Sequence, residues 1–238
     1  MKINNISNDF YCGFKDGIPI ILGYIPVSFT FGLLAVDGGI PVLATILISM
    51  TNLTSAGQFA GMNLIINGAT LLEIALTSCI VNLRYMLMSI ALSQKLSPKI
   101  STLKRCILAF GITDEIFAIS SIRKGELTFS YMLGLITGPY IGWALGTALG
   151  GLISFFLPPM LQSSMGIALY GMFISIVVPA AKESKAVLVV TTIAISISSI
   201  LKWVPYINFV SEGWVVIIAT VVACSIGAII FPREEDEF

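Results

Sequence analysis

The stretch PVLATILISMTNLTSAGQFAGMNLII, residues 41–66, places a polar interruption inside an apolar segment. Ten apolar or small residues come first, TNLTSAGQ interrupts them, and the largely apolar FAGMNLII follows. Ten helical residues rise about 15 Å, which is half of a bilayer core of about 30 Å. A helix that starts at the membrane surface would therefore end near the midplane, and the sequence predicts a broken helix at this place.

The rest of the chain is similarly apolar. Of its 238 residues, 56% are hydrophobic and 11% are charged, against about 25% charged in an ordinary soluble domain. Further apolar segments cover residues 17–36, 71–92, 106–122, 129–153, 155–178, 186–201 and 214–231. Only helices or closed barrels satisfy the backbone in lipid, and the alternation typical of barrel strands is missing. We therefore expect one all-α transmembrane domain over residues 1–238, with residues 1–16 as a short cytoplasmic lead-in rather than a secretory signal.

A second interruption, LQSSMG, lies within the segment 155–178. A shift of the chain by 110 residues lays TNLTSAGQ on residues 161–168 and pairs Gly32 with Gly142. Coincident interruptions in two halves of a chain indicate a transporter site between those halves. The sequence thus predicts two repeats, 17–122 and 129–231, each with a re-entrant broken-helix hairpin.

The distribution of Lys and Arg favours six crossings and two hairpins with a cytoplasmic N-terminus, because cytoplasmic loops are rich in these residues. Three crossings in each half would make the repeats inverted. The basic residues then predicted on the cytoplasmic side are Lys2, Lys15, Lys95, Lys99, Lys104, Arg105, Lys182, Lys185 and Arg233, against Arg123, Lys124 and Lys202 on the other side. Interrupted segments that cross completely are the alternative, and they weaken this bias.

Arg84 lies inside the apolar segment 71–92, eight residues before its end, and Asp114 lies eight residues after the start of the next segment. The two helices are joined by a short loop and must run antiparallel, so we expect both charges at the same depth, close enough to pair. A lone charge at the bilayer centre costs about 2.5 to 3.5 kcal/mol. The pair either fixes helix register without further function or exchanges partners during transport, with Glu115 as the other partner.

Glu73 precedes Arg84 by eleven residues, which is about 20° around a helix, so both share one face. Glu73 is also near the helix entrance, where a solvated position is the simpler interpretation. Asn82 points about 160° away from Arg84 on an ideal helix. This helix is therefore either enclosed by protein on both faces or distorted.

A helix that begins after Thr54 and Ser55 would direct free N–H groups and a positive dipole end toward the midplane, where they suit a carboxylate. Polar packing between helices is the simpler alternative. The other polar candidates for substrate binding are Thr51, Asn52 and Gln58, with Gln162, Ser163 and Ser164 from the second interruption.

Glycines recur at strict four-residue spacing in the segment 129–153, at positions 138, 142, 146 and 150. Small residues at this spacing are typical of close helix contacts in membranes. We expect a packing ridge there, against an internal neighbour or another subunit.

The sequence lacks the residues that several classes of protein require. The chain has no histidine, and its four cysteines are scattered singly, which argues against a zinc site or disulfide framework, so no metal or cofactor is expected. No Walker-type phosphate loop and no histidine-dependent hydrolase motif occurs, so we do not expect an enzyme. A secondary transporter fits best. The alternatives are the permease subunit of an ATP-driven importer and a passive channel.

Four motifs in order, GIPIILGYIPVSFTFGLLA, SAGQFAG, NLR and TDE, resemble the AzlC family of branched-chain amino-acid permeases. The resemblance implies export of leucine-like amino acids from the bacterial cytoplasm across the inner membrane, with a small AzlD-type membrane subunit. The family's arginine is often followed by His, whereas this chain has Tyr85. The motif positions are Pro26, Gly32, Gly57, Gln58, Asn82, Arg84, Asp114 and Glu115, which adds Gly57 and Asn82 to the binding candidates.

Overall fold

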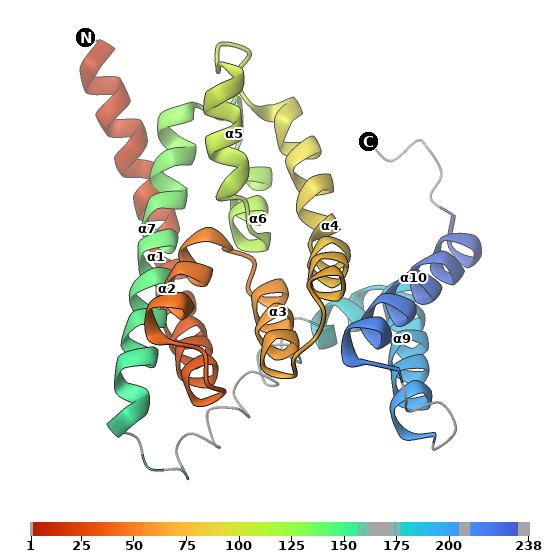
Figure 1. Cartoon of the computed structure of the whole chain (residues 1–238). Helices are drawn as coiled ribbons and strands as arrows, with labels where there is room; N and C mark the ends of the chain where they lie inside the picture. The colour runs from red at the N-terminus through yellow and green to blue at the C-terminus, as the bar shows by residue number, and fades with distance from the viewer. Residues whose placement is uncertain are drawn as a thin grey trace. The chain divides into compact units, whose positions relative to one another are not determined.

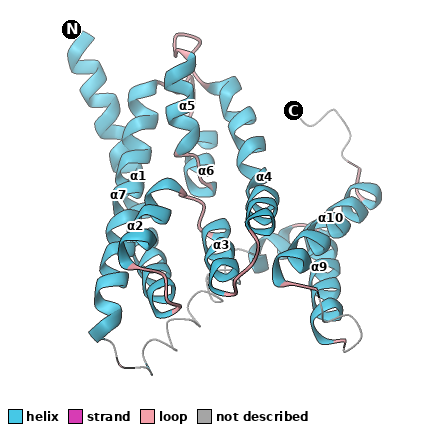
Figure 2. Cartoon of the chain, viewed as in Figure 1, coloured by secondary structure: helices cyan, strands magenta, loops and turns pink. Residues whose placement is uncertain are grey.

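The computed structural model describes residues 2–156, 158, 160, 174, 177–204 and 210–232. The described part contains helices and no named strand, so the predicted all-α class is confirmed (Figure 2). The helices are α1 (Lys2–Asp37), α2 (Val42–Thr51), α3 (Ala56–Ile66), α4 (Leu71–Lys95), α5 (Thr102–Phe110), α6 (Asp114–Ile122), α7 (Phe129–Ile153), the short η1 (Ser154–Phe156), α9 (Lys185–Trp203) and α10 (Glu212–Ile230). By length and apolar composition, 5 helices of this part could cross a membrane: α1, α4, α7 with η1, α9 and α10.

The chain divides into two compact units. The first unit comprises Met1–Phe59 and Val81–Ala168, and the second comprises Ala60–Ile80 and Leu169–Phe238. Helices α3 and α4 each contribute to both units. The units are described separately below.

The first unit is built on α1 and α7, which lie side by side (Figure 1). A Cβ added at Gly13 would lie 2.0 Å from the Tyr131 carbonyl oxygen, and one added at Gly150 would lie 2.0 Å from that of Phe29. Only glycine allows backbones to approach so closely. The predicted glycine ridge therefore packs against an internal neighbour, α1, and the order of the contacts shows that the two helices run parallel.

Helices α2 and α3 form a hairpin beside α7. Going along α2, Ser49 hydrogen-bonds Thr147 at 2.6 Å and the Met50 carbonyl accepts from Tyr140 at 3.0 Å, so α2 runs antiparallel to α7. After residues 52–55, which we call the first tip, the side chain of Gln58 meets Trp143 and the chain turns back along α7. The predicted break is confirmed at this position.

Residues 106–122 do not form the single crossing that we expected. Helix α5 ends at Phe110 and α6 begins at Asp114, with residues 111–113 as the second tip. The loops at the outer ends of the pair are joined, because the Leu127 N–H donates to the Lys95 carbonyl at 3.0 Å and the Ser97 N–H donates back to that of Leu127 at 3.0 Å. The pair thus returns to the end of the unit from which it started and is a second hairpin.

This hairpin changes the predicted topology. One crossing fewer leaves α7 parallel to α1, whereas inverted repeats require corresponding helices to run in opposite directions, so the inverted repeats are not confirmed. Arg123 lies 3.9 Å from Asp9 and 3.7 Å from Asp16. It therefore lies at the same end as the start of α1, and its predicted place on the opposite side is wrong. The predicted second interruption, LQSSMG, lies outside the described residues.

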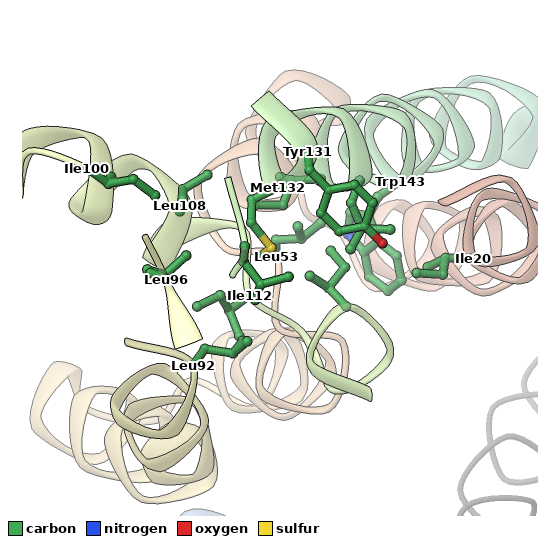
Figure 3. Close-up of a cluster of buried hydrophobic side chains, with 14 of the residues drawn as sticks. Ile20, Leu53, Leu92, Leu96, Ile100, Leu108, Ile112, Tyr131, Met132 and Trp143 are labelled. Atoms are coloured by element: carbon green, nitrogen blue, oxygen red, sulfur yellow. The ribbon is translucent and has the colours of Figure 1, made fainter. Parts of the chain in front are cut away.

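The two tips meet in the buried core of the first unit. Leu53 of the first tip is 4% exposed and Ile112 of the second is 6% exposed, and both belong to one hydrophobic cluster (Figure 3). The cluster also contains Leu92 of α4 and Trp143 of α7. Two hairpins that enter from opposite ends therefore touch midway along the unit.

The second unit contains α9, α10 and the adjoining ends of α3 and α4. A Cβ at Gly227 of α10 would lie 2.4 Å from Val190 Cγ2 of α9, so these two helices pack closely there. The first turn of α4 contacts the start of α10 through Glu73, which accepts a hydrogen bond from the Gly213 N–H.

Candidate functional site

Arg84 of α4 forms the predicted ion pair with Asp114, the first residue of α6. Its Nη1 atom lies 3.1 Å from Asp114 Oδ2, and the two side chains are 41% and 44% exposed. The matched depth inferred from the sequence holds even though Asp114 starts a half-helix rather than lying inside a crossing. Because neither side chain is sealed, a ligand could reach this pair.

Tyr85 connects the ion pair to the first tip. Arg84 Nη2 donates to the Tyr85 hydroxyl at 3.2 Å, and this hydroxyl donates to the Thr54 carbonyl oxygen at 3.1 Å. A hydrogen-bonded chain thus runs from the first tip through α4 to Asp114 at the second tip. Sequence reasoning noted Tyr85 only as a departure from the family pattern and gave it no structural role.

A separate connection passes through α1 and α7. Trp143 Nε1 donates to Gln58 Oε1 at 3.1 Å, and the Trp143 ring packs edge to face on Tyr24, with ring centroids 5.1 Å apart. The Tyr24 hydroxyl lies 2.6 Å from Glu115 Oε2 and 2.7 Å from Thr113 Oγ1. Glu115, expected as a second partner for Arg84, is therefore held by Tyr24. Sequence reasoning missed both aromatic residues, because aromatic side chains are common throughout this apolar chain.

Asn82 and Arg84 of α4 contact different neighbouring helices. A Cβ added at Gly57 of α3 would lie 2.4 Å from Asn82 Oδ1, so Asn82 lies directly against the first turn of α3. Arg84 contacts α6. Both side chains therefore have protein neighbours, although most of α4 is exposed in the described structure.

Three buried polar atoms in this region have no hydrogen-bond partner among the residues that the structure describes: Gln58 Nε2, Asn82 Oδ1 and Arg84 Nε. Leaving a buried polar group unsatisfied costs about 1 to 3 kcal/mol. Two of the atoms are donors and one is an acceptor. Their gathering beside the tips indicates a site that a polar ligand with both acceptor and donor groups would complete.

The N-termini of α3 and α6 differ in charge. At α6, Thr113 caps the helix by accepting from the Ile116 N–H, and Asp114 and Glu115 occupy the first turn. At α3, the first turn has no acidic residue. A helix N-terminus carries about half a positive charge. That charge is compensated by the protein at α6 but not by any first-turn carboxylate at α3.

The other predicted binding residues have different surroundings. Thr51 Oγ1 donates to the Leu47 carbonyl at 2.7 Å, and Thr54 donates to Asn52 Oδ1 at 2.7 Å, so these three side chains make local contacts. Ser55 has φ +44°, a left-handed conformation that is uncommon for a residue other than glycine. Gln162, Ser163 and Ser164 lie outside the described residues.

No cluster of three or more His, Cys, Asp or Glu side chains that could hold a metal ion occurs in the part of the chain that the structure describes. Charged and polar side chains, among them the partly exposed Arg84 and Asp114, lie at the tips. They lie between broken helices in a chain with several apolar helices long enough to span a bilayer. The fold and the site define an integral membrane protein with the kind of broken-helix site that transporters use.

Comparison with known proteins identifies the family of the chain. The chain belongs to the AzlC family, since a family model described as AzlC protein matches residues 19–157, from α1 through both hairpins to the end of α7. This is a family of membrane proteins, and its membership is consistent with a function in membrane transport.

Several relatives match more than half of the chain. The chain is 29% identical to inner membrane protein YgaZ of Escherichia coli over 178 residues, which cover 71% of this chain and 72% of that protein. It is 38% identical to a membrane protein of Archaeoglobus fulgidus over 141 residues, or 59% of this chain and 61% of that protein. A membrane protein of Helicobacter pylori is 28% identical over 155 residues, with 61% and 66% covered. No solved structure matches the chain.

Proposed function

We propose that this chain is the large subunit of a secondary transporter that exports branched-chain amino acids from the cytoplasm with a small AzlD-type membrane subunit. Family membership and the site between the hairpins support transport of a small polar solute. The direction of transport, the small subunit and the preference for a branched side chain come from the family resemblance.

The three unpaired atoms carry the proposal that the cargo is a zwitterion. The α-carboxylate lies at the N-terminus of α3, where Gln58 Nε2 and Arg84 Nε are free to donate. The α-ammonium group donates to Asn82 Oδ1 and approaches Asp114. We place the carboxylate at α3 because the positive N-terminus of this helix has no first-turn acid. We place the ammonium group near α6 because that helix begins with two carboxylates.

Binding would change the partners of Arg84. In the free protein Arg84 pairs with Asp114 and donates to Tyr85. A substrate carboxylate competes for the guanidinium, and the released Asp114 becomes a partner for the ammonium group. Because Tyr85 links Arg84 to the first tip, this exchange acts on both hairpins.

The test is counterflow in liposomes that contain the purified chain, with and without the small subunit. Unlabelled leucine inside should accelerate uptake of labelled leucine, whereas a passive channel shows no counterflow. Two analogues test recognition of the zwitterion: 4-methyl-2-oxopentanoate lacks the ammonium group and 3-methylbutylamine lacks the carboxylate. Neither should exchange, because each leaves part of the site unsatisfied. Exchange of the oxo acid as fast as leucine would exclude Asn82 and Asp114 as an ammonium site.

A further inference from the structure

Glu73, in the first turn of α4, is a buried acid in the second unit. Its side chain is 6% exposed, and its Oε1 atom accepts hydrogen bonds from the Ser211 hydroxyl and from the Gly213 N–H, the latter at 3.1 Å. The solvated position expected from the sequence is wrong, because the start of α10 covers the carboxyl group. This contact joins α4 to another helix that is long enough to span a membrane.

Thr77, one turn further along α4, adds an unused polar group. It is 1% exposed, and its hydroxyl has no hydrogen-bond partner within the described part of the chain. A Cβ at Gly213 would lie 2.6 Å from Glu73 Oε1 and 2.9 Å from Thr77 Oγ1. The absence of a side chain at Gly213 thus lets the first turn of α10 approach the acid and the hydroxyl together.

Both hydrogen-bond donors of this cluster use the same carboxyl oxygen of Glu73, Oε1. The other oxygen, Oε2, is left to the side of Thr77, whose hydroxyl can accept a hydrogen bond from a proton placed there. In the described residues no Lys or Arg forms an ion pair with Glu73, and no other acid or base hydrogen-bonds to it. A buried carboxylate without a cation is unfavourable in a membrane unless it is neutralised.

We propose that Glu73 binds and releases the proton whose movement drives transport, with Thr77, Ser211 and Gly213 as its hydrogen-bond partners. This inference rests on the proposed function. A proton from water adds to Oε2 of Glu73, forms an O–H bond that donates to Thr77, and later returns to water on the other side. The start of α10 presents N–H donors and a positive dipole end, which disfavour a sodium ion but stabilise the carboxylate once the proton has left.

The cluster is connected to the candidate site through one helix. Glu73 and Arg84 both belong to α4, a continuous helix from Leu71 to Lys95. A change in the contact between Glu73 and α10 therefore acts on the helix that holds the ion pair. The chain thereby has a physical route by which proton binding affects substrate binding.

Glu73→Gln tests the proposal, because glutamine imitates the protonated acid: its oxygen accepts from Ser211 and Gly213 and its amide donates to Thr77. We expect the variant to fold, with the melting temperature of the wild type, and to retain leucine counterflow. It should lose at least about 10-fold in leucine accumulation driven by an imposed pH gradient.

Glu126→Gln, at an exposed acid in the loop before α7, is the matched control and should leave both activities unchanged. Accumulation by Glu73→Gln that follows the pH gradient as in the wild type would overturn the proposal, as would wild-type accumulation that follows a sodium gradient instead.

Infrared difference spectroscopy supplies a readout that does not depend on transport. Acidification of the purified wild type should produce the C=O band of a buried protonated carboxyl group. The band should disappear in Glu73→Gln and shift in Thr77→Val, which removes the acceptor. Absence of the band from the wild type would refute proton binding at Glu73. A wild type that shows the band but no counterflow would refute the proposed function alone.

Discussion

The two tips at the centre of the first unit differ in the charges that surround the helix N-terminus following each of them. Each ends one half-helix and starts another in the interior of an apolar protein, yet the second tip brings its own charges and the first does not. Thr113 caps α6 and two carboxylates follow it, whereas no acidic residue follows the start of α3. The N-terminus of α6 thus carries its own counter-charge, whereas that of α3 has no carboxylate in its first turn.

The difference between the tips is most sharply tested at Arg84, which links them. Arg84→Ala should lower the rate of leucine counterflow at least about 100-fold, because loss of the cation leaves Asp114 unpaired and removes a donor for the substrate, each worth a few kcal/mol. The measurement is the initial counterflow rate in liposomes at equal amounts of folded protein.

Asp114→Asn is the companion change for this prediction. In the Arg84→Ala background it should raise the yield of folded protein, since it removes the unpaired charge. A double-mutant cycle for thermal unfolding should show coupling between the two positions. Additive effects would mean that the ion pair contributes nothing to stability.

The uncompensated end of α3 is tested by Gly57→Ala. The new methyl group would lie 2.4 Å from Asn82 Oδ1 and must displace this amide. The leucine concentration for half-maximal counterflow should rise about 10-fold, the effect of losing one buried hydrogen bond to the substrate. Gly61→Ala, on the same helix, is the control, because its methyl group would approach nothing closer than Ser78 Oγ at 3.9 Å. Equal effects of the two substitutions would remove Asn82 from the site.

The connection between the tips is tested by Tyr85→Phe. The variant keeps the ring but loses the hydroxyl that joins Arg84 to the Thr54 carbonyl. We expect counterflow to slow about 5-fold and unfolding to become easier by about 1 kcal/mol, the usual contribution of one hydrogen bond. Unchanged counterflow together with reduced stability would assign the hydroxyl a purely structural role.

The N-terminus of α6 has its own cap and two carboxylates. A substitution there should have the smallest effect on transport. Thr113→Val removes the N-cap and the contact with the Tyr24 hydroxyl, and should lower the free energy of unfolding by about 2 kcal/mol, with the half-saturating leucine concentration unchanged. Thr51→Val, at an exposed residue in the last turn of α2, should stay within about 0.5 kcal/mol of the wild type. A marked change in half-saturation for Thr113→Val would show that the second tip also contacts the substrate through its cap.

Sequence reasoning located the first tip because TNLTSAGQ, polar or small at every position except Leu53, interrupts an apolar segment, which is a strong signal in a membrane protein. It missed the second tip because Gly111, Ile112 and Thr113 include a single polar side chain, so the apolar pattern continues across the break. A weaker signal was present: a glycine at the end of one helix, then a capping threonine followed by two acids. The error propagated, since a crossing in place of a hairpin reverses the predicted direction of α7 and displaces Arg123.

The candidate site was predictable in its charges and not in its aromatic residues. Arg84 and Asp114 could be paired from depth alone, because a charge in an apolar segment needs a partner. Tyr24 and Trp143 could not be singled out, since their contacts depend on how α1 and α7 approach each other. The burial of Glu73 was unpredictable for a similar reason, because it depends on the start of α10, far away in sequence.

The close approach of α1 and α7 has a mechanical consequence. At several levels, among them Gly13, Gly32 and Gly150, a glycine of one helix lies directly against the backbone of the other. Helices α1 and α7 therefore have to move together as one rigid body. Any rearrangement that opens the centre of the first unit to one end and then to the other must therefore come from the hairpins and α4, moving against a fixed support.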